Sequence, residues 1–162
     1  MGQDSGAYKV VLVLHLMAVV IGFGGLVVTG YFGAVAARRK GREGAAIGEA
    51  VEKGYSFSEW FIYAVPVLGI VLVLMSDDAF AFSQAWVSAS FVLYIVGIGL
   101  YHGLHRPTVR RINAILAETA GGSQESAAEL DKLGAKAGMV GGLLNLITVV
   151  VVVLMVFKPG FP

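Results

Sequence analysis

Four long apolar runs limit what this chain can fold into more than any other feature. They cover residues 10–37, 57–75, 85–104 and 139–157. A helix needs about 20 apolar residues to cross the roughly 30 Å hydrocarbon core of a bilayer. Only 14% of the residues are charged, against about 25% in soluble domains. The sequence therefore predicts an all-α integral membrane protein, a four-helix bundle forming a single transmembrane domain over residues 1–162.

The first apolar run resembles a signal peptide only superficially. Its cluster of basic residues follows the run instead of preceding it, and comprises Arg38, Arg39, Lys40 and Arg42. The run also exceeds the about 7–15 residues of a signal-peptide core. We expect it to be retained as a transmembrane helix.

Basic residues are concentrated in two of the segments between spans. Residues 38–56 and 105–138 hold ten of the twelve Lys and Arg residues. Under the positive-inside rule these segments are cytoplasmic loops and both termini lie outside. Anionic lipid headgroups are the expected partners of these bases. Nucleic acid is not expected, because no aromatic residues alternate with the bases.

Both basic loops carry helix signals. Residues 38–56 favour partial helix, and Pro107 suits the first turn of a helix through "TVRRINAILAE". "TAGGSQ" should end that helix. Ser126 followed by Glu129 is typical of a capping box that starts a helix leading into the fourth span.

Small and polar residues mark the faces on which the spans should meet, because such residues allow close approach and hydrogen bonding between helices in lipid. Pro66 should kink the second span. In span order the stripes are His15, Ala18, Gly22, Gly25, Thr29 and Gly33; Glu59, Tyr63 and Pro66; Trp86, Ser90, Tyr94, Gly97 and Tyr101; Gly138, Gly141, Gly142, Asn145 and Thr148.

Two polar groups follow from residue depth along these stripes. His15 should lie about 9 Å below the outer surface, at the level of Ser90, with Trp86 one turn above. A second group gathers at the cytoplasmic side, comprising Glu59, Tyr101, His102, His105 and Asn145. Ionisable residues within a membrane are functional candidates, because burying them is costly. Glu59 is expected to pair with His102 or Arg106.

His15 has three interpretations. It could ligate a metal as an axial ligand of haem, bond as a neutral ring to Ser90 or a backbone carbonyl, or relay protons. His15 and His102 differ in depth by about 18 Å, so they should not clamp one haem. Cysteine is absent, and no HExxH, acidic pair or serine-histidine-acid set occurs. Whether the protein is an enzyme is left open, and transport is disfavoured because midplane charges are lacking.

Two stretches resemble a known group of proteins. "LHLMAVVIGFGGLVVTGYF" resembles the first helix of the bacterial membrane protoporphyrinogen IX oxidase family and of copper-resistance D-type proteins. "AWVSASFVLYIVGIGLYHGLHRPTVRR" resembles the third helix of the oxidase family. The resemblance implies a four-helix bundle in the bacterial inner membrane with His15 in a haem site.

The departures from this family concern its site. The family has a lysine four residues after the tryptophan of the third helix, and this chain has Ser90 there. A tryptophan before the Gly-Leu step is also missing. The chain more closely resembles small bacterial membrane proteins of unknown function that share the Leu-His opening.

Two functions are therefore predicted. The first is a non-enzymatic accessory subunit of a larger membrane complex, of the respiratory kind, which packs against other integral membrane subunits or against itself. The alternative is a haem-b-binding membrane oxidoreductase in which His15, Trp86 and Ser90 form the cofactor site.

Overall fold

A computed structural model describes residues 2–39, 41–118 and 124–160, and this part of the chain is helical with short connections. Four rods are long and apolar enough to cross a membrane, which confirms the predicted fold class. The elements are α1 (Gly6–Arg38), α2 (Gly41–Leu74), α3 (Ala85–Leu100), the π-helical turn η1 (Tyr101–His105), α4 (Arg106–Glu118) and α5 (Gln124–Phe157).

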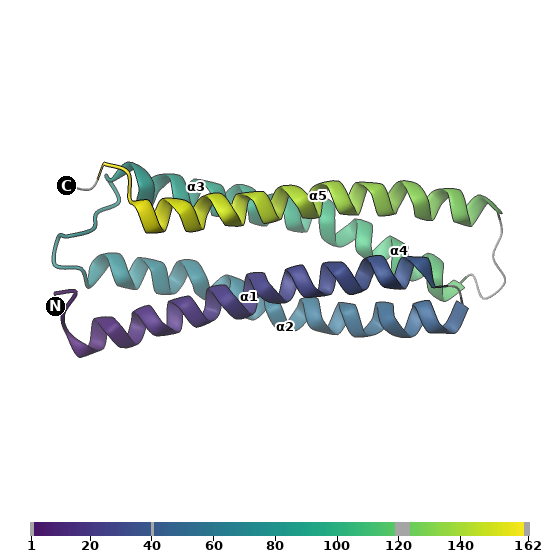
Figure 1. Ribbon diagram of the computed structural model, residues 1–162, viewed down its shortest axis with the longest axis horizontal. Helices are drawn as coiled ribbons and strands as arrows, with labels where there is room; N and C mark the ends of the chain where they lie inside the picture. Colours follow the sequence, from purple (N-terminus) through teal and green to yellow (C-terminus); the bar gives the residue numbers. More distant parts are fainter. Residues whose placement is uncertain (1, 40, 119–123, 161–162) are drawn as a thin grey trace.

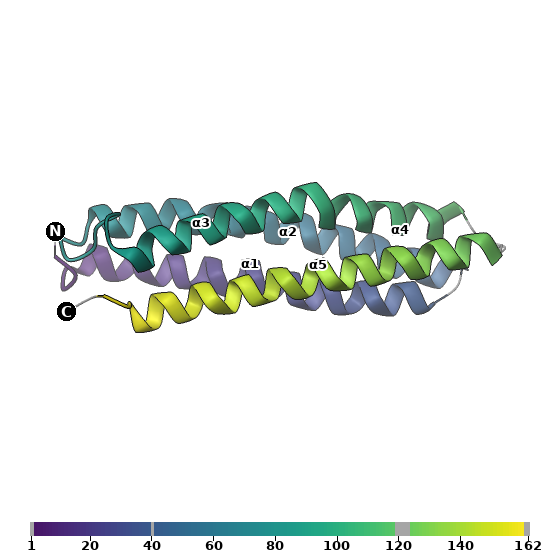
Figure 2. The ribbon, with the colours of Figure 1, turned by 90° about the horizontal axis from the view of Figure 1, so that it is seen from above.

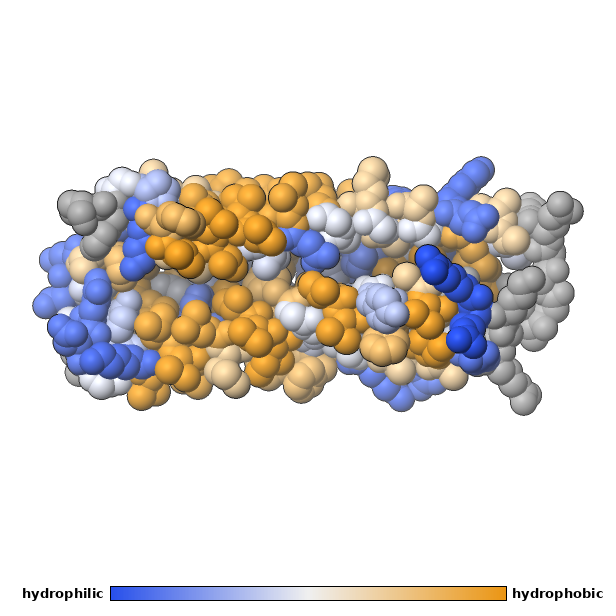
Figure 3. Space-filling model, viewed as in Figure 1, coloured by the Kyte–Doolittle hydropathy of each residue, from blue (hydrophilic) through white to orange (hydrophobic). Residues whose placement is uncertain are grey.

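The rods form two layers (Figures 1 and 2). α1 packs along α2, while α3, η1 and α4 form one continuous rod beside α5. Both chain ends lie at one end of the bundle, here called the terminal end. The junctions α1–α2 and α4–α5 lie at the other end, here called the basic end. On the face in Figure 3, hydrophobic residues dominate the middle and hydrophilic residues gather toward both ends.

The helices extend beyond the apolar runs. α2 begins at Gly41, so most of the first basic loop is helical. α5 begins at Gln124, two residues before Ser126. The predicted capping position of Ser126 was therefore wrong, because the residue lies inside the first turn. Most of the predicted break "TAGGSQ" (119–123) lies outside the described residues.

Pro107 lies in the first turn of α4, as predicted, and α4 continues directly from the π-turn η1. Proline lacks an N–H and clashes with the carbonyl four residues earlier, here that of Gly103. The chain widens into η1, where the Arg106 N–H bonds to the Tyr101 carbonyl. A wider turn of this kind lets a helix continue through such a defect. α3 and α4 consequently form one rod through the proline.

Glycines on α1 allow its close packing on α2. A Cβ at Gly22 would lie 3.0 Å from the Ile62 backbone nitrogen, and one at Gly25 would collide with Ser58. α2 also contributes a glycine to this contact, since a Cβ at Gly54 would collide with Thr29 of α1. The small-residue stripe predicted for the first span is thus the α1–α2 contact.

Replacing Gly22 with leucine is expected to destabilise the bundle by about 1–3 kcal/mol, because the side chain would be forced against α2 backbone. The matched control is Gly24→Leu, since nothing lies within 4 Å of a Cβ at Gly24. Thermal unfolding of the purified protein in detergent measures both. Equal stability of the two variants would contradict the close packing of this seam.

Candidate functional site

A cavity of about 1140 Å³ lies between the two layers and is bordered by residues of every helix. Ordinary small-molecule pockets measure roughly 300–1,000 Å³. Its wall is mainly apolar, with a few polar side chains. Among the predicted site residues the wall includes His15, Glu59, Trp86, Ser90, Tyr101 and Asn145. His102 is the exception.

His15 is buried between α1 and α2, with 5% of its surface exposed. Gly69 of α2 makes room for the ring, since a Cβ there would lie 3.5 Å from Cε1 of His15. The Val65 backbone has a hydrogen-bonding interaction with the imidazole. Nδ1 has no hydrogen-bond partner among the described residues. The ring is therefore held against α2, at the wall of the cavity.

Ser90 and Trp86 border the same cavity from α3. The Ser90 hydroxyl donates to the Trp86 carbonyl at 2.7 Å, so its proton is used within its own helix and not on His15. The Trp86 ring packs edge-on against Phe80 with centroids 5.3 Å apart. Its Nε1 is buried and makes no hydrogen bond within the described part of the chain. The terminal half of the cavity is thus bordered by two nitrogen-bearing rings, those of His15 and Trp86.

Pro66 creates a backbone defect beside the cavity, and α3 compensates for it. Because proline has no N–H, the Ile62 carbonyl lacks its usual helical partner. The Tyr94 hydroxyl donates to this carbonyl at 3.2 Å. The bond connects the two layers, since Ile62 and Tyr94 lie on α2 and α3.

Tyr94→Phe is expected to destabilise the protein by roughly 0.6–1.7 kcal/mol, the range for hydrogen bonds between membrane helices. In a Pro66→Ala background the cost should nearly vanish, because alanine has the backbone N–H that proline lacks and would bond the Ile62 carbonyl. A double-mutant cycle of unfolding free energies tests this. An equal cost in both backgrounds would contradict the assignment.

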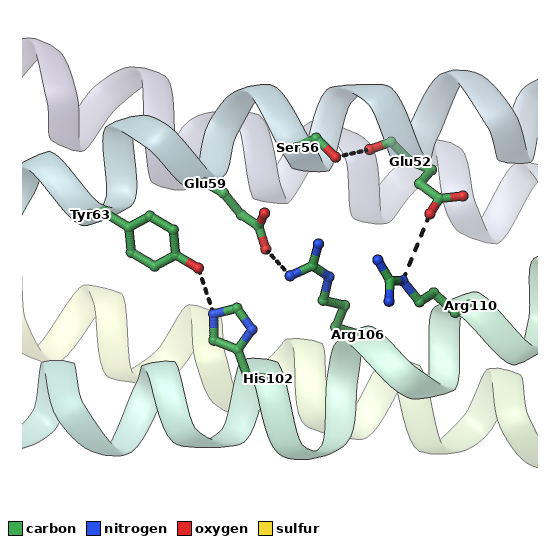
Figure 4. A network of polar contacts seen from close by, with 7 residues as sticks. All are labelled: Glu52, Ser56, Glu59, Tyr63, His102, Arg106 and Arg110. Carbon is green, nitrogen blue, oxygen red and sulfur yellow. Dashed lines mark hydrogen bonds and ion pairs between the residues drawn. The ribbon is translucent and has the colours of Figure 1, made fainter.

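Glu59 forms an ion pair with Arg106 toward the basic end, with Oε1 and Nη1 2.9 Å apart (Figure 4). The Glu59 side chain is 12% exposed and that of Arg106 33%. Of the two partners expected for Glu59, the structure thus has Arg106. His102 pairs with Tyr63 instead, with 2.7 Å between the hydroxyl oxygen and Nε2.

His105 is the buried histidine of this end, although the sequence prediction selected His102 as the site residue. Its Nε2 lies 3.2 Å from the Tyr55 hydroxyl, and only 8% of the residue is exposed. Gly141 of α5 leaves room beside the ring. The sequence spacing could have predicted this burial. Tyr101 and His105 are four residues apart and therefore share one helix face, and Tyr101 on that face is buried.

Residues 9–159 match the model of a family described as "Predicted integral membrane protein (DUF2269)". This chain belongs to that family. The membership and the four apolar rods together establish an integral membrane protein embedded in a lipid bilayer. No curated protein and no solved structure matches the chain.

The described part of this DUF2269 chain holds no group of three or more His, Asp or Glu side chains that could bind a metal ion. Asn145 of α5 borders the cavity but is exposed. The candidate site therefore consists of an apolar cavity with His15 and Trp86 toward the terminal end. Glu59, Tyr101, Tyr55 and His105 border it toward the basic end.

Proposed function

We propose that this DUF2269 protein binds haem b in the cavity between its two layers, with His15 as the axial ligand. The observation that carries this proposal is the burial of His15 at the wall of a cavity of about 1140 Å³, with an Nδ1 that makes no aligned hydrogen bond in the described chain. Burying a polar nitrogen without a partner is unfavourable. A ligand that bonds to it would remove that penalty.

A single histidine at the cavity suits a metal ion that is already coordinated by a macrocycle. A bare ion needs several protein ligands, and the described residues supply no such group. Haem brings its own ring of nitrogens and needs only an axial imidazole from the protein. His105 cannot serve the same iron as His15. Their α2 neighbours, Tyr55 and Gly69, are fourteen residues apart, or about 21 Å of helix.

The polar nitrogens favour haem over a lipid chain as the occupant. An acyl chain would contact the apolar wall of the cavity but would leave His15 Nδ1 and Trp86 Nε1 without hydrogen-bond partners. A porphyrin is largely apolar and carries carboxylates at one edge, for which the indole N–H of Trp86 is a suitable donor. When bound, haem would supply one-electron chemistry. His15 would hold it, and the apolar wall would exclude water.

Haem titration of the purified protein in detergent tests the proposal. The wild type should show a saturable shift of the haem absorption band, and His15→Ala should weaken binding at least about a hundredfold, through loss of an axial ligand. His102→Ala is the matched control, because His102 does not border the cavity. Equal affinity of the wild type and His15→Ala would refute ligation by His15.

An accessory role in a larger membrane complex is the second candidate. α5 is the least buried of the four rods. Its last turns expose apolar residues only, namely Val149, Val150, Val152, Val153, Val156 and Phe157. Such a face fits a neighbouring helix as well as lipid. Purification in mild detergent followed by native mass spectrometry should then yield a complex, and a lone stable monomer would count against this role.

A further inference from the structure

A second, much smaller pocket of about 20 Å³ lies at the basic end between α2 and the η1–α4 segment. A space of about 10–15 Å³ suffices for one water molecule if two to four polar groups surround it. The pocket is therefore large enough for one water. Its polar wall includes Tyr55, Glu59, Tyr101, His105, Arg106 and Asn113.

Two polar atoms in this wall lack aligned hydrogen bonds. Oε1 of Glu59 forms the ion pair with Arg106. It makes no hydrogen bond of good geometry with the described residues. Nδ1 of His105 also makes no aligned hydrogen bond, but its ring interacts with the Ala137 backbone of α5, which does not border the small pocket. A buried water typically satisfies a group such as the Glu59 carboxylate.

Six of the wall residues also border the large cavity, namely Tyr55, Glu59, Tyr101, His105, Val109 and Asn113. They form the partition between the two spaces. The Tyr101 hydroxyl interacts electrostatically with the Glu59 carboxylate, and the Tyr55 hydroxyl bonds to His105. Four residues of the partition, Tyr55, Glu59, Tyr101 and His105, thus carry groups that can take up or release a proton.

The small pocket leads toward exposed charges at the basic end. Its wall continues to Glu52 and Arg110, whose side chains are 51% and 60% exposed and lie 3.8 Å apart. Figure 4 shows these residues in sequence along α2 and α4, from Glu59 and Arg106 to Glu52 and Arg110. The pocket therefore lies between exposed polar residues and the partition.

We propose that Glu59 and His105, bridged by water in the small pocket, form a proton-exchange site between solvent at the basic end and the large cavity. A hydronium ion in the small pocket gives a proton to the Tyr55 oxygen while the Tyr55 hydroxyl proton moves to Nε2 of His105. The reverse transfer releases the proton and leaves the ring neutral. Glu59 accepts or releases a proton through the same water. The charged groups facing the site are Arg106 of α4 and the more distant Glu52 and Arg110.

The use of this proton deepens the haem proposal, because a ligand in the cavity would receive it. The site itself does not depend on haem. Its test therefore uses the protein in lipid nanodiscs with no ligand added, so that a failure of haem binding and a failure of the proton site remain distinguishable.

Hydrogen–deuterium exchange at the imidazole C2 position, read by mass spectrometry over a range of pH, is the experiment. C2 exchange requires a protonated ring and access of water. His105 should exchange with a clear titration step. His15 is equally buried but borders only the mainly apolar cavity. It serves as the internal reference and should exchange at least about tenfold more slowly, because an apolar wall does not hold ordered water.

Ser56→Phe tests whether the exchange of His105 depends on water in the small pocket. Ser56 borders only the small pocket and is exposed, so a phenyl group can narrow the pocket without disturbing the core. His105 exchange should fall about tenfold as the water is excluded. Lys53→Phe, at an exposed position of α2 outside both pockets, should leave it unchanged. Exchange of His105 as slow as that of His15, or unaffected by Ser56→Phe, would overturn the proposal.

Discussion

Replacing Arg106 with leucine is expected to destabilise the protein by about 3 kcal/mol, because removal of one partner of a buried ion pair leaves an uncompensated charge. The Glu59 carboxylate is almost enclosed, with 12% of its side chain exposed. Neutralising it should restore most of the loss, so Arg106→Leu combined with Glu59→Gln should be more stable than Arg106→Leu alone. Denaturant unfolding in a fixed detergent measures the wild type and both variants.

Arg110→Leu is the matched control for this prediction. Arg110 also faces a glutamate, Glu52, but at 3.8 Å and with both side chains more than half exposed. Exposed pairs contribute about 0–1 kcal/mol. If Arg106→Leu lowered the free energy of unfolding no more than Arg110→Leu does, the prediction for the Glu59–Arg106 ion pair would be wrong.

Gly69→Leu is expected to abolish haem binding, with an affinity loss of at least about a hundredfold as the axial ligand is displaced. The reason is steric, because a Cβ at Gly69 already lies 3.5 Å from Cε1 of His15. A longer branched chain would push the ring out of place. Gly69→Ala adds only an ordinary van der Waals contact and should bind haem nearly as the wild type does.

Gly99→Leu controls for a general effect of leucine in a transmembrane helix. Nothing lies within 4 Å of a Cβ at Gly99. Haem titration of the three glycine variants, with circular dichroism to confirm folding, separates the outcomes. Binding by Gly69→Leu at wild-type affinity would show that the His15 position is not the ligand site.

Hydropathy and small-residue spacing were sufficient to predict the helical architecture. Each bilayer crossing requires its own long apolar run, so the four runs determine the four rods. The stripe through Gly22 and Gly25 correctly marks a close contact, because only small residues let two helix backbones approach each other. Both features belong to single helices and can be read without knowing the partner.

The pairing of polar side chains could not be predicted in the same way. Residue counting places Ser90 near the level of His15, but the Ser90 hydroxyl bonds to its own helix at Trp86. Serine in a helix has this local alternative, and depth along the axis does not reveal it. The same limit applies to Glu59, for which the sequence allowed His102 or Arg106.

The π-turn is the other feature beyond reach of the sequence analysis. Pro107 signals a helix start as readily as a defect within a continuous rod. The choice depends on packing, since Tyr101 and His105 are buried and held within η1. The packing of η1 therefore determines that His105 is the buried histidine and that His102 lies beside Tyr63.

The absorption spectrum of haem-loaded protein carrying His15→Gly, before and after addition of imidazole, tests the central claim most directly. The substitution removes the ring and leaves space between α1 and α2 for a free imidazole. We predict that the haem band of the wild type is lost in the variant and returns with imidazole. An unchanged band in His15→Gly, or no haem band in the wild type, would contradict a haem site built on His15.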